Sequence, residues 1–199
     1  MKTQSSLNPR CGRLCCYVLA SMLLAAVTHA YALDNWTTNQ VSTNWFGLSH
    51  VVYGNGRYVA AGGRSDGGAI LSSDDGLNWT LRADGGCCGP PSLVWGLTYS
   101  EGRFVAVGHF GGTAISTNGV DWTFGRAASA GLTGVAVADG ICVAVGDGTV
   151  GNTVDSIFKS TNGIDWVAEA KSTNEIRDVW DVANRGSRFV AVAAGGYAY

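Results

Sequence analysis

The sequence predicts an all-β fold: a β-propeller of four-stranded antiparallel blades, about four of which are present. The first observation is a phrase, S-x-D/N-G-x-D/N-W, that occurs at 73–79, 116–122 and 160–166. Its tryptophans, Trp79, Trp122 and Trp166, lie 43 and then 44 residues apart. A repeat of this length indicates that one supersecondary unit is used several times.

The second observation is a hairpin pattern upstream of each phrase. Two short apolar or alternating runs flank a glycine-containing turn, which is the signature of a tight β-hairpin. The pattern is clear at 52–62 and 98–108 and weaker at 137–146 and 186–192. No window shows a sustained apolar period of 3.6 residues, so helical repeats are excluded.

One full period contains four predicted strands, at 48–53, 57–62, 68–72 and 78–82. Four antiparallel strands in a repeat of this length are typical of one propeller blade. The turn between the third and fourth strands is the tryptophan phrase. In that turn we expect Asp or Asn to accept hydrogen bonds from backbone amides and Gly to adopt a positive φ.

The turn phrase resembles the Asp box of bacterial neuraminidase-type repeats, found in the sialidase-like superfamily. A whole blade resembles two groups: secreted bacterial repeat proteins with the pattern YGNGRFVAVG…S.DG..W, and the photosystem II stability/assembly factor-like propellers. The resemblance covers 34–199 and implies a β-propeller, but such blades occur in hydrolases, receptors and assembly factors alike. The stricter spacing S-x-D-x-G-x-x-W is met only at Ser72, Asp74, Gly76 and Trp79, so a sialidase relationship is not favoured.

Residues 1–32 have the pattern of a secretory signal peptide, which we expect to be cut after Ala32. A basic leader precedes an apolar core at 14–27, and small residues at Ala30 and Ala32 match a cleavage site. The core is shorter than the roughly 20 residues that a membrane span needs. We therefore expect a secreted or periplasmic protein, without membrane insertion, whose propeller domain is 33–199.

Charge restricts the partners of that domain. The leader holds three of the 13 basic residues and none of the 15 acidic residues, so residues 33–199 carry a net charge of −5. Nucleic acids and anionic membranes require a basic face. We therefore expect neither as a partner.

The cysteines outside the leader predict one unusual loop. Cys87 and Cys88 are adjacent and flanked by glycines, so they can close a vicinal disulfide; the alternative is a tight loop with free thiols. Cys142 aligns with Tyr58 and Phe104 and is expected to fill a core position. One cysteine pair without histidines at ligand spacing is too little for a metal site, and we expect no cofactor.

The two ends of the repeat leave the number of blades open. Trp36 lies 43 residues before the first tryptophan of the series, so 33–38 is interpreted as a lone outer strand. At the other end, alignment of the copies places Tyr199 at Ala114, the start of a third strand. Either Trp36 closes a four-bladed ring, or the chain is part of a larger propeller. The expected blades are about 43–84, 92–127, 130–168 and 174–199.

Side chains that recur with the repeat are expected to be scaffold rather than site. They are the tryptophans and serines of the turn phrase and the arginines at one strand start, Arg57, Arg103 and Arg188. A catalytic serine needs a single special environment with a base nearby. His50 and His109 are the histidines outside the leader, and we expect neither to have a cysteine or serine partner in its own loop.

Residues that break the repeat form the predicted ligand-binding face. The loops that join the second to the third strand, and one blade to the next, meet on one side of a propeller. The candidates there are Arg64, Asp66, Trp95, His109, Asp147, Asp155 and Trp180. Trp95 and Trp180 stand where the other copies have Ser49 and Thr133. Exposed aromatic side chains beside charges suit a sugar or a peptide, whereas the alternative for both tryptophans is core packing.

These observations favour an exported, non-catalytic binding or scaffolding module that recognises a carbohydrate or protein partner through its loop face. The alternative is a fragment of an Asp-box glycoside hydrolase. That chemistry needs two carboxylates about 5–10 Å apart. Asp66, Asp147 and Asp155 are the carboxylates that could provide them.

Overall fold

The computed structural model describes residues 38, 47–64, 67–85, 93–127, 131–147, 156–169 and 178–199. The chain separates into two compact units, Met1–Asn39 and Gln40–Tyr199. All described strands lie in the second unit. The predicted signal peptide and the lone strand around Trp36 lie outside the described residues.

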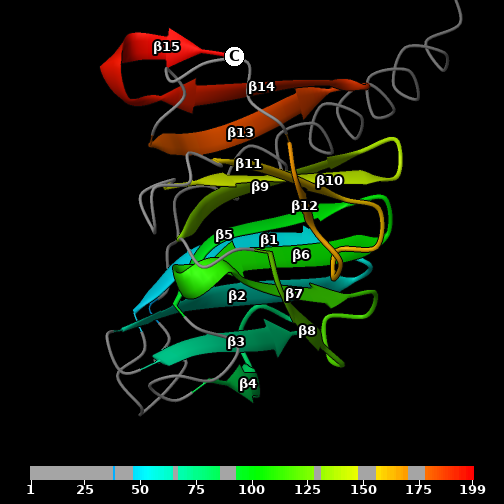
Figure 1. Ribbon diagram of the computed structural model, residues 1–199. Coiled ribbons are helices and arrows are strands. Elements are labelled where there is room, and N and C mark those ends of the chain that lie inside the picture. Colours follow the sequence, from blue (N-terminus) through cyan, green and yellow to red (C-terminus); the bar gives the residue numbers. More distant parts are fainter. Residues whose placement is uncertain are drawn as a thin grey trace, which may run out of the picture. The chain divides into compact units, whose positions relative to one another are not determined.

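Four antiparallel sheets follow one another along the chain, and Figure 1 shows them as successive layers. The first blade contains β1 (Leu48–Gly54), β2 (Arg57–Arg64), β3 (Gly67–Ser73) and β4 (Thr80–Asp84). The second contains β5 (Val94–Ser100), β6 (Arg103–Gly108), the 3-10 turn η1 (His109–Gly111), β7 (Gly112–Ser116) and β8 (Thr123–Arg126).

The third blade contains β9 (Leu132–Ala138), β10 (Ile141–Gly146), β11 (Ile157–Ser160) and β12 (Val167–Ala168). The fourth has three described strands, β13 (Val179–Arg185), β14 (Arg188–Ala193) and β15 (Tyr197–Ala198), with the 3-10 turn η2 (Ala194–Gly196) before the last. Strands in each sheet pair in chain order. The predicted all-β fold of four-stranded antiparallel blades is confirmed.

The four strands predicted for the first repeat are all present. Its fourth strand begins at Thr80 rather than at Asn78, because Asn78 and Trp79 belong to the turn. In the last blade, Ala193 pairs with Tyr197 and Val192 with Ala198, so Tyr199 does stand at the third strand, as predicted.

The inner hairpins of the four blades share one register and one bulge. In each, the pairing skips the second residue of the inner strand: Ser49, Trp95, Thr133 and Trp180. A bulge leaves one residue unpaired and changes the direction of its side chain. The two tryptophans that break the sequence repeat therefore occupy the position where the backbone itself is irregular.

The tryptophan phrase forms the turn between the third and fourth strands of the first three blades. In the first copy, Asp75 Oδ1 accepts backbone N–H bonds from Leu77 at 2.8 Å and Asn78 at 2.7 Å. Ser73 Oγ accepts the N–H of Gly76 at 2.9 Å, and Gly76 has φ 75°, which favours glycine. The other two copies repeat these bonds with Asn in place of Asp75. The predicted turn chemistry is confirmed.

The hydrophobic core lies between neighbouring blades. We call the face that a blade turns toward the following blade its forward face, and the opposite side its backward face. The forward face of the first blade, with Val59, Ala61 and Ile70, packs on the backward face of the second, with Phe104, Ala106 and Ala114. Equivalent clusters join the second blade to the third and the third to the fourth.

The recurring tryptophans and Cys142 belong to these clusters. Trp122 packs against the cluster between the first two blades, and Trp166 against the next one. Cys142 is a fully buried free thiol in the second cluster, where burial raises its pKa. The expected scaffold roles of the two tryptophans and of this cysteine are confirmed.

We expect Phe104→Ala to lower the free energy of unfolding by about 3–5 kcal/mol, the usual cost of truncating a buried aromatic side chain. Phe104 is fully buried, and its ring centroid lies 4.6 Å from that of Tyr99 and 6.3 Å from that of Trp122. Urea denaturation measures the change. Val167→Ala is the control, because Val167 is 63% exposed and should change stability by no more than about 0.5 kcal/mol. Equal losses in both variants would contradict packing between blades.

The turn at Asp75 should make stability depend on pH. Hydrogen bonds from the backbone and side chain of Asn78, and from the backbone of Leu77, hold the pKa of Asp75 well below its usual range. A lowered folded-state pKa stabilises the fold above the unfolded value of about 3.9, and this contribution is lost as the pH falls below that value.

Asp75→Asn keeps an acceptor oxygen, as in the other two turns, but does not titrate. Thermal melts of both proteins from neutral pH to about pH 2 measure the difference, which isolates Asp75 from the other carboxylates. The Tm of the wild type should fall more steeply below about pH 4 than that of the variant. Parallel curves would show that the carboxylate does not stabilise the turn.

Candidate functional site

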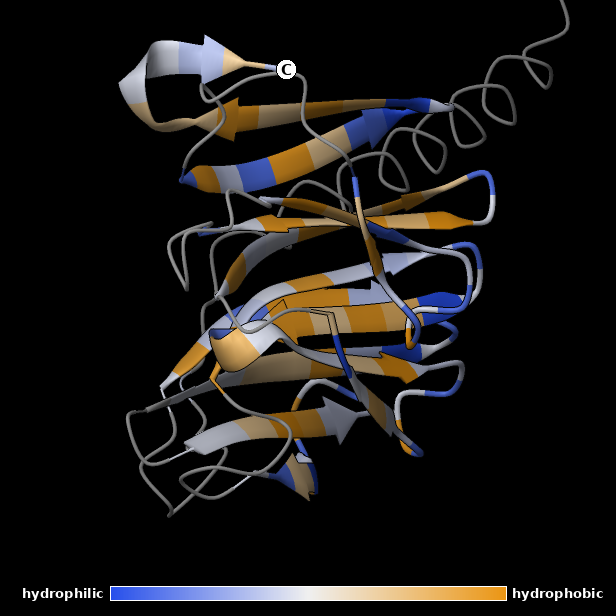
Figure 2. Cartoon of the chain, in the orientation of Figure 1, coloured by the Kyte–Doolittle hydropathy of each residue, from blue (hydrophilic) through white to orange (hydrophobic). Residues whose placement is uncertain are grey.

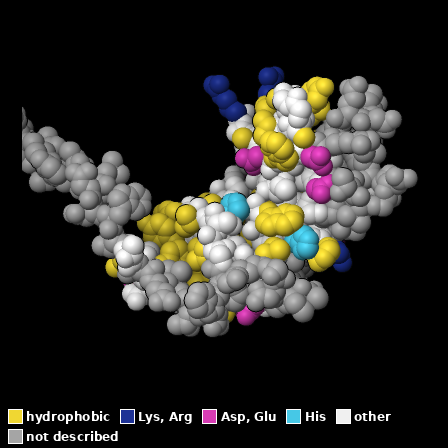
Figure 3. All heavy atoms as spheres, turned by 90° about the vertical axis from the view of Figure 1, so that its left-hand side faces the viewer, with side chains coloured by type: hydrophobic (Ala, Val, Ile, Leu, Met, Phe, Trp, Pro, Cys, Tyr) yellow, Lys and Arg dark blue, Asp and Glu magenta, His cyan; other side chains and the backbone are white. Residues whose placement is uncertain are grey.

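A groove opens where the inner strands of all four blades begin. His50 lines it from the first blade, Trp95 from the second, Thr133 from the third, and Trp180 and Asp181 from the fourth. Its volume is about 420 Å³. Figure 3 shows this side of the molecule, where two histidine side chains lie among hydrophobic side chains with acidic groups nearby. The groove combines flat aromatic surface with a few polar groups.

Trp95 is held between two neighbouring segments. Its ring centroid lies 5.1 Å from that of His109, which in turn lies 3.8 Å from the ring of Phe110. The second contact of Trp95 is with Gly131. A Cβ placed on that glycine would lie 2.5 Å from the Trp95 ring. The absence of a side chain at Gly131 therefore allows the indole to lie over the start of the third blade.

Trp180 occupies the equivalent bulge in the fourth blade and is the more exposed of the pair. Its side chain is 61% exposed, against 37% for Trp95. A side chain buried in the core would have almost no exposed surface. Trp180 is therefore not packed in the core, whereas Trp95 is partly covered by its neighbours and partly exposed to the groove.

His50 has a serine partner, contrary to expectation. Its Nδ1 and the Oγ of Ser49 are hydrogen-bonded at 2.8 Å. The inference from sequence failed because Ser49 is the bulge residue, which no longer points to the opposite side of the strand from its neighbour. Within the described chain no carboxylate is bonded to the second ring nitrogen of His50. The pair thus lacks the third group that orients a catalytic imidazole.

Of the predicted site residues, the structure brings three together beside Gly131. Trp95 covers Gly131 and contacts His109, and the backbone N–H of Asp147 donates to the Gly131 carbonyl at 2.9 Å. Trp180 lines the same groove as Trp95. The others lie outside the described part of the chain: Asp66, Asp155, Cys87, Cys88 and the side chain of Arg64.

Sequence reasoning did not identify His50, Thr133 and Asp181 as groove residues. The signal was present, because His50 and Asp181 stand where the other two blades have Gly96 and Gly134. A position that alternates between glycine and a polar side chain breaks the repeat as clearly as the tryptophans do.

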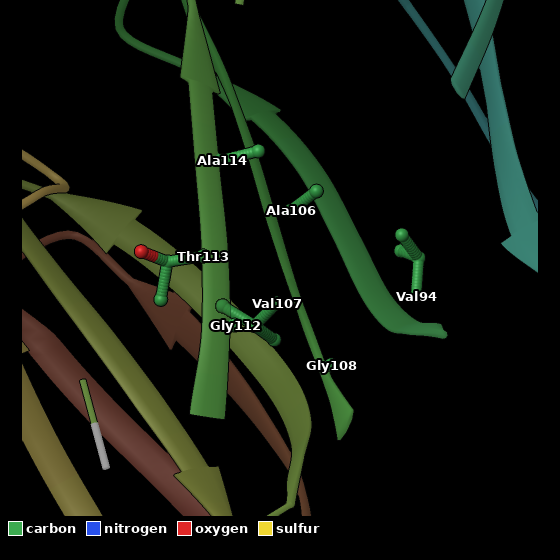
Figure 4. Close-up of a pocket in the computed structure, with 7 residues that line it drawn as sticks. All are labelled: Val94, Ala106, Val107, Gly108, Gly112, Thr113 and Ala114. Carbon is green, nitrogen blue, oxygen red and sulfur yellow. The ribbon is translucent and has the colours of Figure 1, made fainter. Parts of the chain in front are cut away.

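A second hollow, of about 10 Å³, lies on the backward face of the second blade. Figure 4 shows Ala106 and Ala114 on one side of their strands and Thr113 directed to the other. The lining is mostly apolar, and the space is no larger than one water molecule requires. It is a packing void between small side chains rather than a ligand site.

The described residues contain no group of three His, Cys, Asp or Glu side chains placed to hold a metal ion. They also contain no helix long and apolar enough to cross a membrane.

Two designed proteins share this arrangement of sheets. The computationally designed Ika4 protein matches with a TM-score of 0.60 and 15% identity, over 83% of this chain and 96% of Ika4. The fold is a β-propeller. The designed Ika8 protein matches with a TM-score of 0.54 and 16% identity, over 79% of this chain and 46% of Ika8. At these identities the similarity concerns the fold alone.

Comparison of the sequence gave no further relatives. No family model matches it, and no curated protein matches it.

Gly131→Ala should displace the Trp95 ring and leave the fold intact. The added methyl would lie 2.5 Å from the far edge of a side chain that can move into the groove. The near-ultraviolet circular dichroism of the tryptophans should change, while the far-ultraviolet spectrum stays as in the wild type. An unchanged near-ultraviolet spectrum would contradict the contact between Gly131 and Trp95.

Proposed function

We propose that this protein is an exported, non-catalytic binding module that recognises a neutral carbohydrate through the groove between its inner strands. The observation that carries the proposal is the pair of exposed tryptophans, Trp95 and Trp180, at the bulge position of two blades and in one groove. Sites for small ligands are lined by aromatic side chains with a few well-placed polar groups, in volumes of about 300–1,000 Å³. The groove fits that description.

The polar side chains of the groove supply hydrogen bonds suited to sugar hydroxyls. Thr133 Oγ1 donates to the Val179 carbonyl at 2.7 Å, so its lone pairs remain available to a ligand hydroxyl. Asp181 is oriented by the N–H of Val182, which its Oδ1 accepts at 2.8 Å. The apolar face of a sugar ring would stack on an indole while these groups bind its hydroxyls.

Charge favours a neutral ligand over an acidic one. The expected mature chain carries a net charge of −5, and Asp181 lines the groove itself. A uronic-acid polymer or a nucleic acid would be repelled by this field. The predicted signal peptide and the resemblance to Asp-box propellers support an extracellular or periplasmic role, where polysaccharides are available. A protein loop with hydroxyl and amide groups is the second ligand class.

Trp180→Ala should weaken binding at least tenfold, because it removes the largest exposed surface of the groove without touching the core. Isothermal titration against a panel of neutral polysaccharides measures the affinity, and tryptophan emission reports the same event. Leu77→Ala is the matched control, since Leu77 is 59% exposed in the turn at the other end of the first blade.

The same panel separates binding from hydrolysis. Release of reducing sugar that is abolished by Asp147→Asn would establish the glycoside hydrolase alternative and overturn the proposal. Saturable binding without release supports it. Equal affinity of the wild type and Trp180→Ala would show that the groove is not the ligand site.

A further inference from the structure

We infer that a second copy of this chain covers the two end faces of the blade array. The forward face of the fourth blade in each copy packs on the backward face of the first blade in the other. This inference is independent of the proposed ligand. It rests on the fact that the chain already builds the same interface three times internally.

The residues of that interface are equivalent from blade to blade. On the forward face, Val59, Val105, Val143 and Val190 share one position of the second strand, and Ala61, Val107, Val145 and Val192 share the next. On the backward face, Val51, Leu97, Val135 and Val182 share one position of the inner strand. Because the inner hairpins of the four blades pair in the same register, the exposed fractions of equivalent residues can be compared directly.

The forward face of the fourth blade keeps its apolar residues although nothing in the described chain covers them. Val190 and Val192 are 45% and 46% exposed. Their equivalents in the first blade, Val59 and Ala61, are fully buried. Figure 2 shows the strand that carries Val190 and Val192, β14, as mostly hydrophobic.

The backward face of the first blade is open along its inner strand. Val51 and Tyr53 are 63% and 59% exposed, while Val135 and Val137, at the equivalent positions of the third blade, are 7% and 1% exposed. Other parts of this face, such as Leu71, are already buried. The open part is the strip formed by the inner strand, together with Tyr58 and Leu81. A contiguous patch of large, exposed apolar side chains marks an interaction surface.

A polar contact between two blades has an equivalent at the ends of the array, which supports a second copy as the occupant. Arg103 of the second blade donates to the carbonyl of Thr161 in the third at 3.2 Å. Its equivalent in the fourth blade is the exposed Arg188, and the equivalent of Thr161 in the first blade is Asp74, which forms an ion pair with Arg57 of its own blade at 2.8 Å and keeps 71% of its side chain exposed. The joint between copies would therefore bring Arg188 close to the Arg57–Asp74 ion pair, at the position where Arg103 donates to a neutral carbonyl.

A single two-fold axis satisfies both end faces of both copies. Figure 1 shows the first and fourth blades at opposite ends of the array, where their described strands do not face each other. The chain covers 96% of Ika4 and only 46% of Ika8, so the same arrangement is compatible with an assembly about twice its length. Two copies would give a closed set of eight blades in which the exposed valines of each fourth blade are covered by the first blade of the other copy.

Sedimentation equilibrium of the purified full chain tests the inference. The wild type should have twice the mass of one chain. Val190→Lys and Val51→Glu should each yield monomers, because each homodimer would contain two defective joints. Val167→Lys is the control, because Val167 is 63% exposed on an outer strand of the third blade and should leave the dimer unchanged.

Mixing the two variants gives the decisive measurement. A heterodimer of Val190→Lys with Val51→Glu has one wild-type joint and one joint that pairs lysine with glutamate, so the mixture should regain the dimer mass. All substituted positions are exposed in one copy, and far-ultraviolet circular dichroism confirms the fold; Val192→Lys replaces a variant that misfolds.

Three results would overturn the inference. They are a wild-type monomer at every concentration, dimers that both charged variants leave intact, and polymers that grow with concentration instead of closing at two copies.

Discussion

The close approach of neighbouring inner strands is the constraint on which the rest of the structure depends. A Cβ on Gly96 would lie 3.1 Å from the carbonyl oxygen of Thr133, and one on Gly134 would lie 2.9 Å from the Cα of Asp181. These glycines let the second, third and fourth blades meet almost backbone to backbone. The outer strands can then diverge, and the apolar faces between them fill with branched and aromatic side chains. Packing is thus set at the inner edge of each blade.

The groove follows from the same constraint. The residue before each of these positions is skipped in the pairing, so a side chain there is directed away from the regular ladder. Large residues at that bulge, Trp95 and Trp180, project into the groove without disturbing the contact between blades. Where the glycine itself is replaced, by His50 and Asp181, polar groups enter the same space. The position that sets the contact between blades and the position that projects into the groove are therefore neighbours on the same inner strand.

The sequence predicted the fold well because the repeat displays each requirement several times. Turn residues such as Gly76 and the alternation of the hairpins are local signals, and the strands form where those signals place them. The bulge at Ser49 was not predictable, since a one-residue shift in pairing leaves no mark in composition. Its consequence for His50, the hydrogen bond with Ser49, was missed for this reason, whereas the exposed Trp180 was among the residues predicted for the ligand-binding face.

A repeat also explains why apolar side chains stay at the ends of the array. If the end faces met only water, charged residues at Val51, Tyr53, Val190 and Val192 would cost nothing in packing and would discourage association. These positions instead carry the residue types that their equivalents use between blades. At the valine positions the forward face of the fourth blade has the same chemistry as the buried ones, although Asp181 and Arg185 add charges on its inner strand. A surface that keeps the apolar residues by which equivalent surfaces of the same molecule pack has the properties of an interface rather than of an exterior.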